Sequence, residues 1–375
     1  MATADKNRKR IVIKIGSSSL TSLHGEISRR KLERLVDEVA ELKDNGYEVL
    51  LVSSGAVAAG YRKLGCLERP TTLPEKQAAA SIGQGLLMEA YSELFLSHGY
   101  VASQILITRS DFSDEIRYNN ARNTANVLLE RGIVPIVNEN DTVTVNRLKF
   151  GDNDTLSAKV AGLICADMLI ILSDIDGLYD SDPRENKDAK LLEKVEEITP
   201  SIEKAAGDSG SSVGTGGMKS KIDAVKIAMA SGVPTFLGKA GVPNILVDAV
   251  KRKAKGTYFD SKTKLNLDQK RQWILFNSGP EGEVILKKDA DLSQLGKKSL
   301  LPSKIDRVIG TFKVGSVIKI LDYEQKPVGL GVVNYSSTEL VQWKKEELTM
   351  EEYPKEVVYN EDLVCHIEKS IPVSV

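Results

Sequence analysis

Short apolar runs alternate with longer segments of helical periodicity along the first two thirds of the chain, and this alternation constrains the fold most. The apolar runs cover residues 11–15, 48–52, 101–107, 133–137, 168–172 and 233–237, and the helical segments cover 29–43, 75–96, 122–131, 155–165 and 217–230. Strands that alternate with helices pair in parallel, and the helices cover both faces of the sheet. We therefore predict an α/β fold with a mainly parallel sheet between two layers of helices.

A different pattern begins after Lys262, where short β-rich runs appear at residues 273–277, 283–286, 316–321 and 328–334. Turn-forming Gly and Pro residues separate these runs. We predict that residues 1–262 form the α/β domain, 263–271 a linker, 272–356 a small β-barrel domain and 357–375 a tail.

Composition excludes several classes of protein. The 375 residues carry a net charge of -1, which provides no overall field to attract nucleic acid or an anionic membrane. The 3 cysteines and 3 histidines are widely separated, so neither a disulfide framework nor a zinc site is expected. Since no apolar run is long enough to cross a bilayer and no secretion signal precedes the first strand, we expect a cytoplasmic protein.

The densest group of polar residues lies in segment 150–158, FGDNDTLSA, which opens a helix of apolar periodicity. Asp152, Asn153 and Asp154 stand at its start. Capping a helix needs only one such residue. The segment therefore favours a functional site over simple capping.

Two lysine-bearing segments are suited to binding anions. Lys14 lies in an apolar strand just before Gly16, and burying its ammonium group is costly unless an anion meets it. The alternative is a lysine that reaches solvent from an edge strand. The glycine-rich segment 214–221 opens a helix and carries Lys219 and Lys221, which is typical of an anion cradle, although a flexible surface turn would also explain it.

Polar residues follow other strands as well: residues 53–55, 138–141 and 173–174. In open α/β sheets ligands bind outside the carboxyl ends of the strands, so we expect these segments to line one crevice. After Gly55, however, the small residues Ala58, Ala59 and Gly60 are equally well explained by close helix packing.

Two anion-binding loops, an acidic cluster and polar strand ends on one sheet indicate phosphoryl transfer. A carboxylate acceptor is already a nucleophile, so an enzyme of this kind mainly positions it and neutralises the charge of the phosphoryl group. The signatures of serine hydrolases and protein kinases are absent from the sequence.

The same motifs, in order across about residues 10–260, resemble those of the glutamate 5-kinases in the amino acid kinase family. The resemblance implies phosphorylation of the γ-carboxylate of L-glutamate with ATP and Mg²⁺, the first step of proline biosynthesis. It also implies inhibition by proline and a homo-oligomer, either a dimer or a tetramer.

The resemblance implies a role for individual residues. Lys14 and Lys221 would stabilise the transferring phosphoryl group, and Asp154 would hold both lysines. Glutamate would be bound by Ser54, Gly55, Asn138, Asp141, Asp152 and Asn153, and ATP by Lys14, Gly16, Ser173, Asp174, Thr215, Gly216, Gly217, Met218, Lys219, Ser220 and Lys221. Charge alone does not separate Lys219 from Lys221, and no direct Mg²⁺ ligand is assigned because the metal is expected to bind through the ATP phosphates.

The C-terminal part, residues 272–356, resembles a PUA domain in the segments 299–302, 308–312, 315–317 and 335–337. PUA domains are common in RNA-modifying enzymes. Segments 289–292 and 328–331 depart from the family pattern, and mixed charges leave no uniform basic face, so we do not expect RNA binding.

Two alternatives remain open. A kinase of this family could use aspartate, acetylglutamate, carbamate or UMP as the acceptor instead of glutamate. The chain could also be an RNA-associated binding protein with a degenerate kinase domain, but the presence of Lys14, Asp154 and Lys221 argues against degeneracy.

Overall fold

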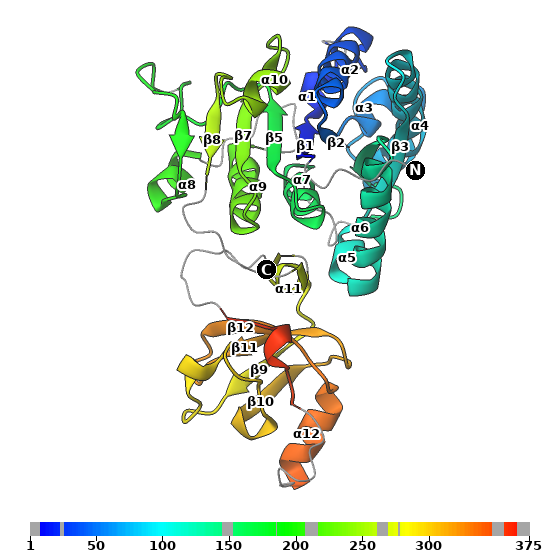
Figure 1. Ribbon diagram of the computed structural model, residues 1–375. Helices are drawn as coiled ribbons and strands as arrows, with labels where there is room; N and C mark the ends of the chain where they lie inside the picture. Colours follow the sequence, from blue (N-terminus) through cyan, green and yellow to red (C-terminus); the bar gives the residue numbers. More distant parts are fainter. Residues whose placement is uncertain are drawn as a thin grey trace. The chain divides into compact units, whose positions relative to one another are not determined.

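The computed structural model describes residues 8–22, 26–144, 153–184, 186–206, 217–260, 269–276, 278–346 and 356–365. The chain divides into two compact units, the first comprising residues 1–112 and 116–265 and the second residues 113–115 and 266–375. Each unit has its own β-sheet (Figure 1). In the described part of the chain, no helix is both long and apolar enough to cross a bilayer.

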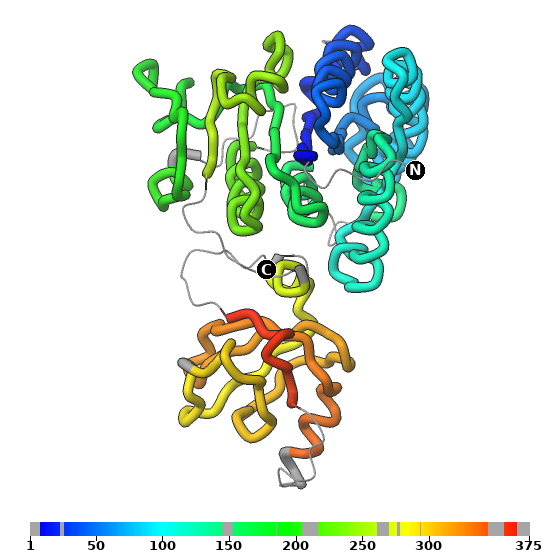
Figure 2. Tube along the Cα trace, viewed as in Figure 1, coloured from blue at the N-terminus to red at the C-terminus, as the bar shows by residue number. Residues whose placement is uncertain are grey.

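The first unit is built on an eight-stranded sheet in the order β3-β4-β2-β1-β5-β7-β8-β6. Its strands are β1 (Arg10–Ile15), β2 (Glu48–Ser53), β3 (Ala102–Ile107), β4 (Val134–Glu139), β5 (Met168–Ser173), β6 (Lys194–Val195), β7 (Thr235–Lys239) and β8 (Thr257–Phe259). All neighbours pair in parallel except β7 and β8. The predicted mainly parallel sheet is confirmed, and β1 and β5, far apart in the sequence, run side by side at its centre (Figure 2).

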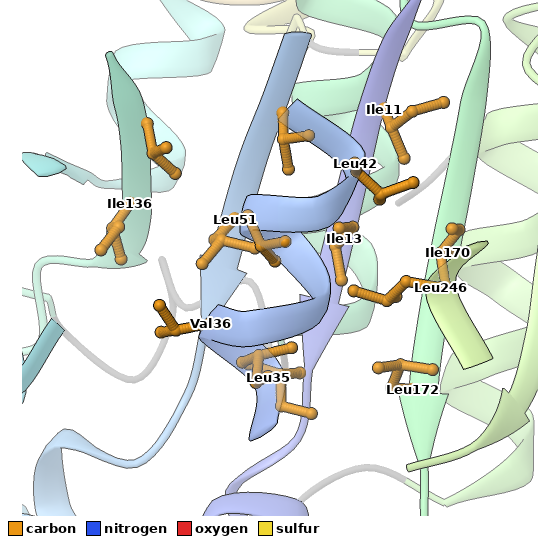
Figure 3. Close-up of a cluster of buried hydrophobic side chains, with 14 of the residues drawn as sticks. Ile11, Ile13, Leu35, Val36, Leu42, Leu51, Ile136, Ile170, Leu172 and Leu246 are labelled. Atoms are coloured by element: carbon orange, nitrogen blue, oxygen red, sulfur yellow. The ribbon is translucent and has the colours of Figure 1, made fainter. Parts of the chain in front are cut away.

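Helices cover both faces of this sheet. They are α1 (Ser17–Leu20), α2 (Arg29–Asp44), α3 (Ala56–Gly60), α4 (Leu73–Ser97), α5 (Arg109–Ser113), α6 (Glu115–Glu130), α7 (Asn153–Leu163), α8 (Pro200–Ala206), α9 (Met218–Ala230) and α10 (Ile245–Val250). On one face, Ile13 and Ile170 of the strands pack with Leu42 of α2 and Leu246 of α10 (Figure 3). The alternate strand residues, such as Val12, are buried as well, which requires cover on the opposite face.

The short helix α3 crosses α4 at very close range. A Cβ atom built on Gly60 would lie 1.9 Å from Ala79 O, and one built on Gly83 would lie 1.8 Å from Ala56 O. Only glycine fits at these two positions, because any side chain would overlap the backbone of the other helix. Close packing therefore accounts for Gly60, as the sequence alternative allowed.

The second unit contains a five-stranded sheet in the order β10-β9-β11-β12-β13. Its elements are α11 (Gln269–Phe276), β9 (Gly282–Leu286), η2 (Leu292–Gln294), η3 (Pro302–Lys304), β10 (Ile305–Gly310), β11 (Val317–Leu321), β12 (Pro327–Val332), α12 (Ser337–Glu346), η5 (Asn360–Asp362) and β13 (Leu363–Cys365). Residues from the sheet and from α12 enclose a separate apolar core that includes Val284, Ile320 and Leu340.

Two sequence predictions about this unit were wrong. The run 273–277 was predicted as a strand, but Gln269–Phe276 form helix α11 with Trp273 and Ile274 buried. A short apolar run fits a buried helix as well as a strand, and periodicity cannot separate the two. The predicted tail contributes strand β13, which pairs with β12, so the predicted boundary at residue 356 lies too early in the chain.

Helix α7 carries a buried lysine. Lys159 is only 7% exposed. Burial lowers the pKa of its ammonium group to about 7, and the positive charge of Arg109 adds to this effect.

The close helix crossing predicts a contrast between two glycines of α4. Gly83→Ala should lower the free energy of unfolding by about 3 kcal/mol or more, because the methyl group forces α3 and α4 apart. Gly85→Ala is the matched control: no atom lies within 4 Å of its Cβ position, and it should stabilise the helix by about 0.5–1 kcal/mol. Chemical denaturation measures both, and equal effects would contradict the crossing.

The lowered pKa of Lys159 predicts that the stability of the folded protein depends on pH. Its pKa is about 7 in the folded protein and 10.5 when unperturbed, so between these pH values the unfolded chain binds more protons. The free energy of unfolding should therefore increase as the pH rises from about 7 to about 10. The melting temperature of Lys159→Met relative to the wild type should be highest at or below pH 7 and fall towards pH 10. Lys76→Met, at an exposed position of α4, should show no such trend; parallel curves for Lys159→Met and the wild type would contradict the assignment.

Candidate active site

The polar segments recognised in the sequence meet at the carboxyl ends of the central strands. The last residue of β1, Ile15, pairs with Ser53 at the end of β2 and with Leu172 near the end of β5. Because these strands are parallel and in level register, the segments that follow them leave the sheet at the same edge. Helix α7 packs against β1 and β5 and begins at the same edge with Asn153 and Asp154.

The centre of the site is a carboxylate between two ammonium groups. Asp154 Oδ1 lies 2.5 Å from Lys14 Nζ, and Asp154 Oδ2 lies 3.2 Å from Lys221 Nζ. All three side chains are buried, with Asp154 0% exposed and each lysine 6% exposed. The structure thus brings together three residues that are distant in the sequence and belong to β1, α7 and α9.

Lys14 is not a lysine that reaches solvent from an edge strand, because β1 lies between β2 and β5 in the middle of the sheet. A Cβ atom built on Gly16 would lie 3.6 Å from Lys14 Nζ. The absence of a side chain at Gly16 leaves the space beside this ammonium group open for a ligand atom.

The two lysines determine the charge state of Asp154. Burial alone would raise the pKa of this carboxyl group, but the adjacent ammonium groups of Lys14 and Lys221 outweigh burial and hold the pKa below its ordinary value. Asp154 is therefore ionised at neutral pH, and the three groups together carry one positive charge. Ser220 Oγ lies 3.1 Å from Asp154 Oδ2 and 2.9 Å from Gly217 O, at the start of α9.

The structure separates the two lysines that charge alone could not distinguish. Lys221 is buried against Asp154, whereas Lys219, two residues earlier on α9, is exposed. Helix α9 begins at Met218 with Gly217 as its N-cap, and no side chain caps it. Thr215 and Gly216, expected in the anion cradle, lie outside the described residues.

A second cluster, made of amides and hydroxyls, adjoins Asp154 through its neighbour Asn153. Asn153 Nδ2 lies 3.0 Å from Ser53 O, 2.9 Å from Ser54 Oγ and 2.9 Å from Asn138 Oδ1. Asn138 is 4% exposed, and its Oδ1 also accepts a hydrogen bond from the backbone N–H of Glu139. Three of the residues predicted to bind the substrate, Ser54, Asn138 and Asn153, therefore form one hydrogen-bonded network.

Gly55 follows Ser54 and has a φ of +110°, in the left-handed region that favours glycine. This conformation lets the chain turn from β2 directly into α3. A side chain at Gly55 would also crowd Ile27, whose Cδ1 would lie 3.3 Å from the added Cβ.

The other predicted residues are less closely connected. Asp141 follows β4 and is partly exposed. Ser173 Oγ donates to Asp174 Oδ1 over 2.9 Å at the end of β5, and Asp174 is exposed. Asp152 lies outside the described residues.

Asp176, two residues after Asp174, pairs with two lysines. Its carboxylate oxygens lie 3.5 Å from Lys239 Nζ and 3.7 Å from Lys255 Nζ. In the part of the chain that the structure describes, no group of three or more His, Cys, Asp or Glu residues is arranged to hold a metal ion.

Sequence reasoning missed two residues of α4 that support the site. Gln84 Oε1 accepts a hydrogen bond from Asn138 Nδ2 over 2.9 Å, and Tyr91 OH lies 2.9 Å from Ser53 Oγ. Their spacing of seven residues, which places both on one helix face, could have indicated a shared partner. That spacing alone does not identify the partner.

Comparisons with known proteins agree with this architecture. Residues 9–239 match the amino acid kinase family and residues 282–349 match the PUA domain. The chain is 65% identical to "Glutamate 5-kinase 2" of Bacillus subtilis, over 99% of this chain and 100% of the relative. It is 47% identical to "Glutamate 5-kinase" of Bacillus cereus, over 89% of this chain and 91% of the relative.

Among solved structures, the fold is similar to that of carbamate kinase from Giardia lamblia, with a TM-score of 0.51 and 16% sequence identity. The similarity covers 68% of this chain and 99% of the carbamate kinase. Since the family match spans more than half of the sequence and the high identity extends over nearly all of it, the chain belongs to the amino acid kinase family.

Proposed function

We propose that this protein transfers the γ-phosphoryl group of ATP to the γ-carboxylate of L-glutamate and forms L-glutamyl 5-phosphate, the first step of proline biosynthesis. The observation that carries the proposal is the buried trio of Lys14, Asp154 and Lys221, in a chain 65% identical to a glutamate 5-kinase. Two ammonium groups held by one carboxylate suit a phosphoryl group whose negative charge must be neutralised during transfer.

In this proposal each lysine acts on the transferring phosphoryl group and Asp154 positions both. Because Asp154 has a lowered pKa and two cationic partners, it orients the lysines rather than accepting the proton of a substrate. No strong base is required, since a carboxylate acceptor is already ionised at neutral pH. ATP would contact Lys14, Gly16, Ser173, Asp174 and the start of α9.

Mg²⁺ would reach this site mainly through the phosphates of ATP. Asp154, the most buried carboxylate of the site, is already engaged by two lysines, which fits a metal bound by substrate oxygens rather than by a protein cage. The ion would neutralise phosphate charge, and we assign it no direct protein ligand.

Glutamate would bind beside the phosphoryl site, at the network of Ser54, Asn138 and Asn153. Ser54 Oγ accepts from Asn153, which leaves the Ser54 hydroxyl hydrogen able to donate to a substrate carboxylate. We assign Asp141 to the α-ammonium group, and Gly55 and Asp152 to the same pocket, on the strength of the family motif.

Two finer features rest on the family resemblance: we infer that proline inhibits the enzyme and that the chain forms a dimer or tetramer. From the sequence itself we infer that the protein works in the cytoplasm. We also infer that residues 1–262 contain the whole kinase site, because every residue assigned to ATP or glutamate precedes residue 240.

The acceptor is the first point to test. With Mg²⁺ and ATP, L-glutamate should release ADP and give a hydroxamate when the acyl phosphate is trapped with hydroxylamine, whereas aspartate, acetylglutamate, carbamate and UMP should not. The motivation is Asp141, which suits a free α-ammonium group that acetylglutamate lacks. Equal rates with glutamate and acetylglutamate would exclude this assignment, and activity with another acceptor alone would replace the proposed substrate.

Substitutions should separate chemistry from binding. Lys221→Ala should lower kcat by roughly a hundredfold to a thousandfold, because it removes a preorganised charge that acts on the transition state. Asp141→Ala should mainly raise the KM for glutamate. The matched control is Lys219→Ala, two residues away on the same helix and exposed; a larger loss of kcat in this control than in Lys221→Ala would move the catalytic role to Lys219.

A further inference from the structure

We infer that Gln84 of α4 is a positioning residue that fixes the orientation of the Asn138 amide and, through it, of Asn153 in the glutamate site. The inference rests on the proposed function. Gln84 has no place among the residues that the family motif assigns to the site. Its role is to orient a side chain that contacts substrate, without contacting the substrate itself.

Backbone groups identify which atom is the nitrogen and which is the oxygen in every amide of this network. Asn138 Oδ1 accepts from the N–H of Glu139 over 2.9 Å, and a backbone N–H can only donate. The oxygen of Asn138 must therefore face that N–H, and its Nδ2 must face Gln84, 2.9 Å away. The Gln84 atom that receives this hydrogen bond must then be the oxygen Oε1.

The other end of the network is fixed in the same way. Asn153 Nδ2 lies 3.0 Å from Ser53 O, a backbone carbonyl that can only accept. The same nitrogen therefore donates to Asn138 Oδ1, which agrees with the orientation required from the Glu139 side. The amide of Asn153 is thus held with its Oδ1 turned away from this network, where a substrate donor can meet it.

Helix α4 holds Gln84 rigidly at this point. Gln84 follows Gly83, at which α4 packs directly against the backbone of α3. The backbone of α4 therefore has no room to shift at this turn. Seven residues later, Tyr91 is fully buried and contacts Ser53 at the end of β2. The same face of α4 therefore supports the ends of both β2 and β4.

The buried Nε2 atom of Gln84 argues against a role in packing alone. Among the residues that the structure describes, this atom has no hydrogen-bond partner. A buried donor without an acceptor costs about 1–3 kcal/mol, which a methionine of similar size would avoid. Within the described part of the chain, the bond to Asn138 is the one polar interaction of the Gln84 side chain, so the amide acts through Oε1.

Removing Oε1 should loosen Asn138. Its Nδ2 then becomes a buried donor without an acceptor, and the amide can relieve this cost by tilting away from the position at which its Oδ1 meets Asn153. Asn153 then loses a partner and its fixed orientation. Binding of glutamate should suffer, whereas the Lys14–Asp154–Lys221 trio, which Gln84 does not touch, should keep its geometry.

The test compares Gln84→Met, Gln84→Glu and the control Gln104→Met, an exposed position on β3. Gln84→Met should raise the KM for glutamate roughly tenfold, with kcat and the KM for ATP within about twofold of the wild type. Its melting temperature should change little, because the substitution removes one unpaired donor, Gln84 Nε2, and leaves another, Asn138 Nδ2. Gln84→Glu keeps an oxygen facing Asn138 and should restore most of the affinity for glutamate.

Two results would overturn the inference: an unchanged KM for glutamate in Gln84→Met, or equal rises in the KM of both substrates together with a lower melting temperature, which would indicate general damage. Failure of Gln84→Glu to improve on Gln84→Met would also count against a role for Oε1. If the wild-type protein itself formed no hydroxamate from glutamate, the proposed function would fail, and the inference with it. The wild-type reaction therefore distinguishes the two failures.

Discussion

The ion pairs of Asp154 are the interaction on which the rest of the candidate site depends. One buried carboxylate connects a lysine of the central strand β1 with a lysine of α9, and it stands in the first turn of α7. Without this carboxylate two ammonium groups would remain buried close together, and breaking a buried pair in this way typically costs about 3–5 kcal/mol. The trio therefore contributes to the arrangement of the three elements, and it presents positive charge where the strands end.

The amide network solves a different problem, because it must hold neutral groups in one orientation. Asparagine side chains can rotate by half a turn at little cost unless their partners are fixed. Here a backbone N–H at one end and a backbone carbonyl at the other leave one consistent arrangement for Asn138 and Asn153. The strand ends, together with Gln84 of α4, therefore determine how the network presents its hydrogen-bonding groups.

The sequence predicted the parallel sheet because its apolar runs and helical segments are long and regular, and it predicted Lys14 and Asp154 because a lysine within an apolar strand and three polar residues in one helical turn are unusual. Charge alone could not show that Lys221, and not Lys219, faces Asp154, since that depends on how α9 rotates against α7; only the family motif pointed to Lys221. Gln84 was missed for the same reason: its partner is distant in the sequence and belongs to another element. The α11 segment was assigned wrongly because eight residues with a short apolar run fit either structure.

Asn153 and Asp154 are neighbours on α7, but Asn153 belongs to the amide network and Asp154 to the lysine trio. The proposed glutamate site and the proposed phosphoryl site are therefore adjacent, although different residues hold each of them. Asn153 is held by the ends of β2 and β4, and Asp154 is held by β1 and α9. In the proposed function, glutamate held at this network is thereby brought beside the lysines that would stabilise the transferring phosphoryl group, and positioning of this kind can supply much of the rate acceleration. Because the two sets of supports share no side chain among the bonds described, a change in α4 can alter how the acceptor binds without altering the lysines that act on the phosphoryl group.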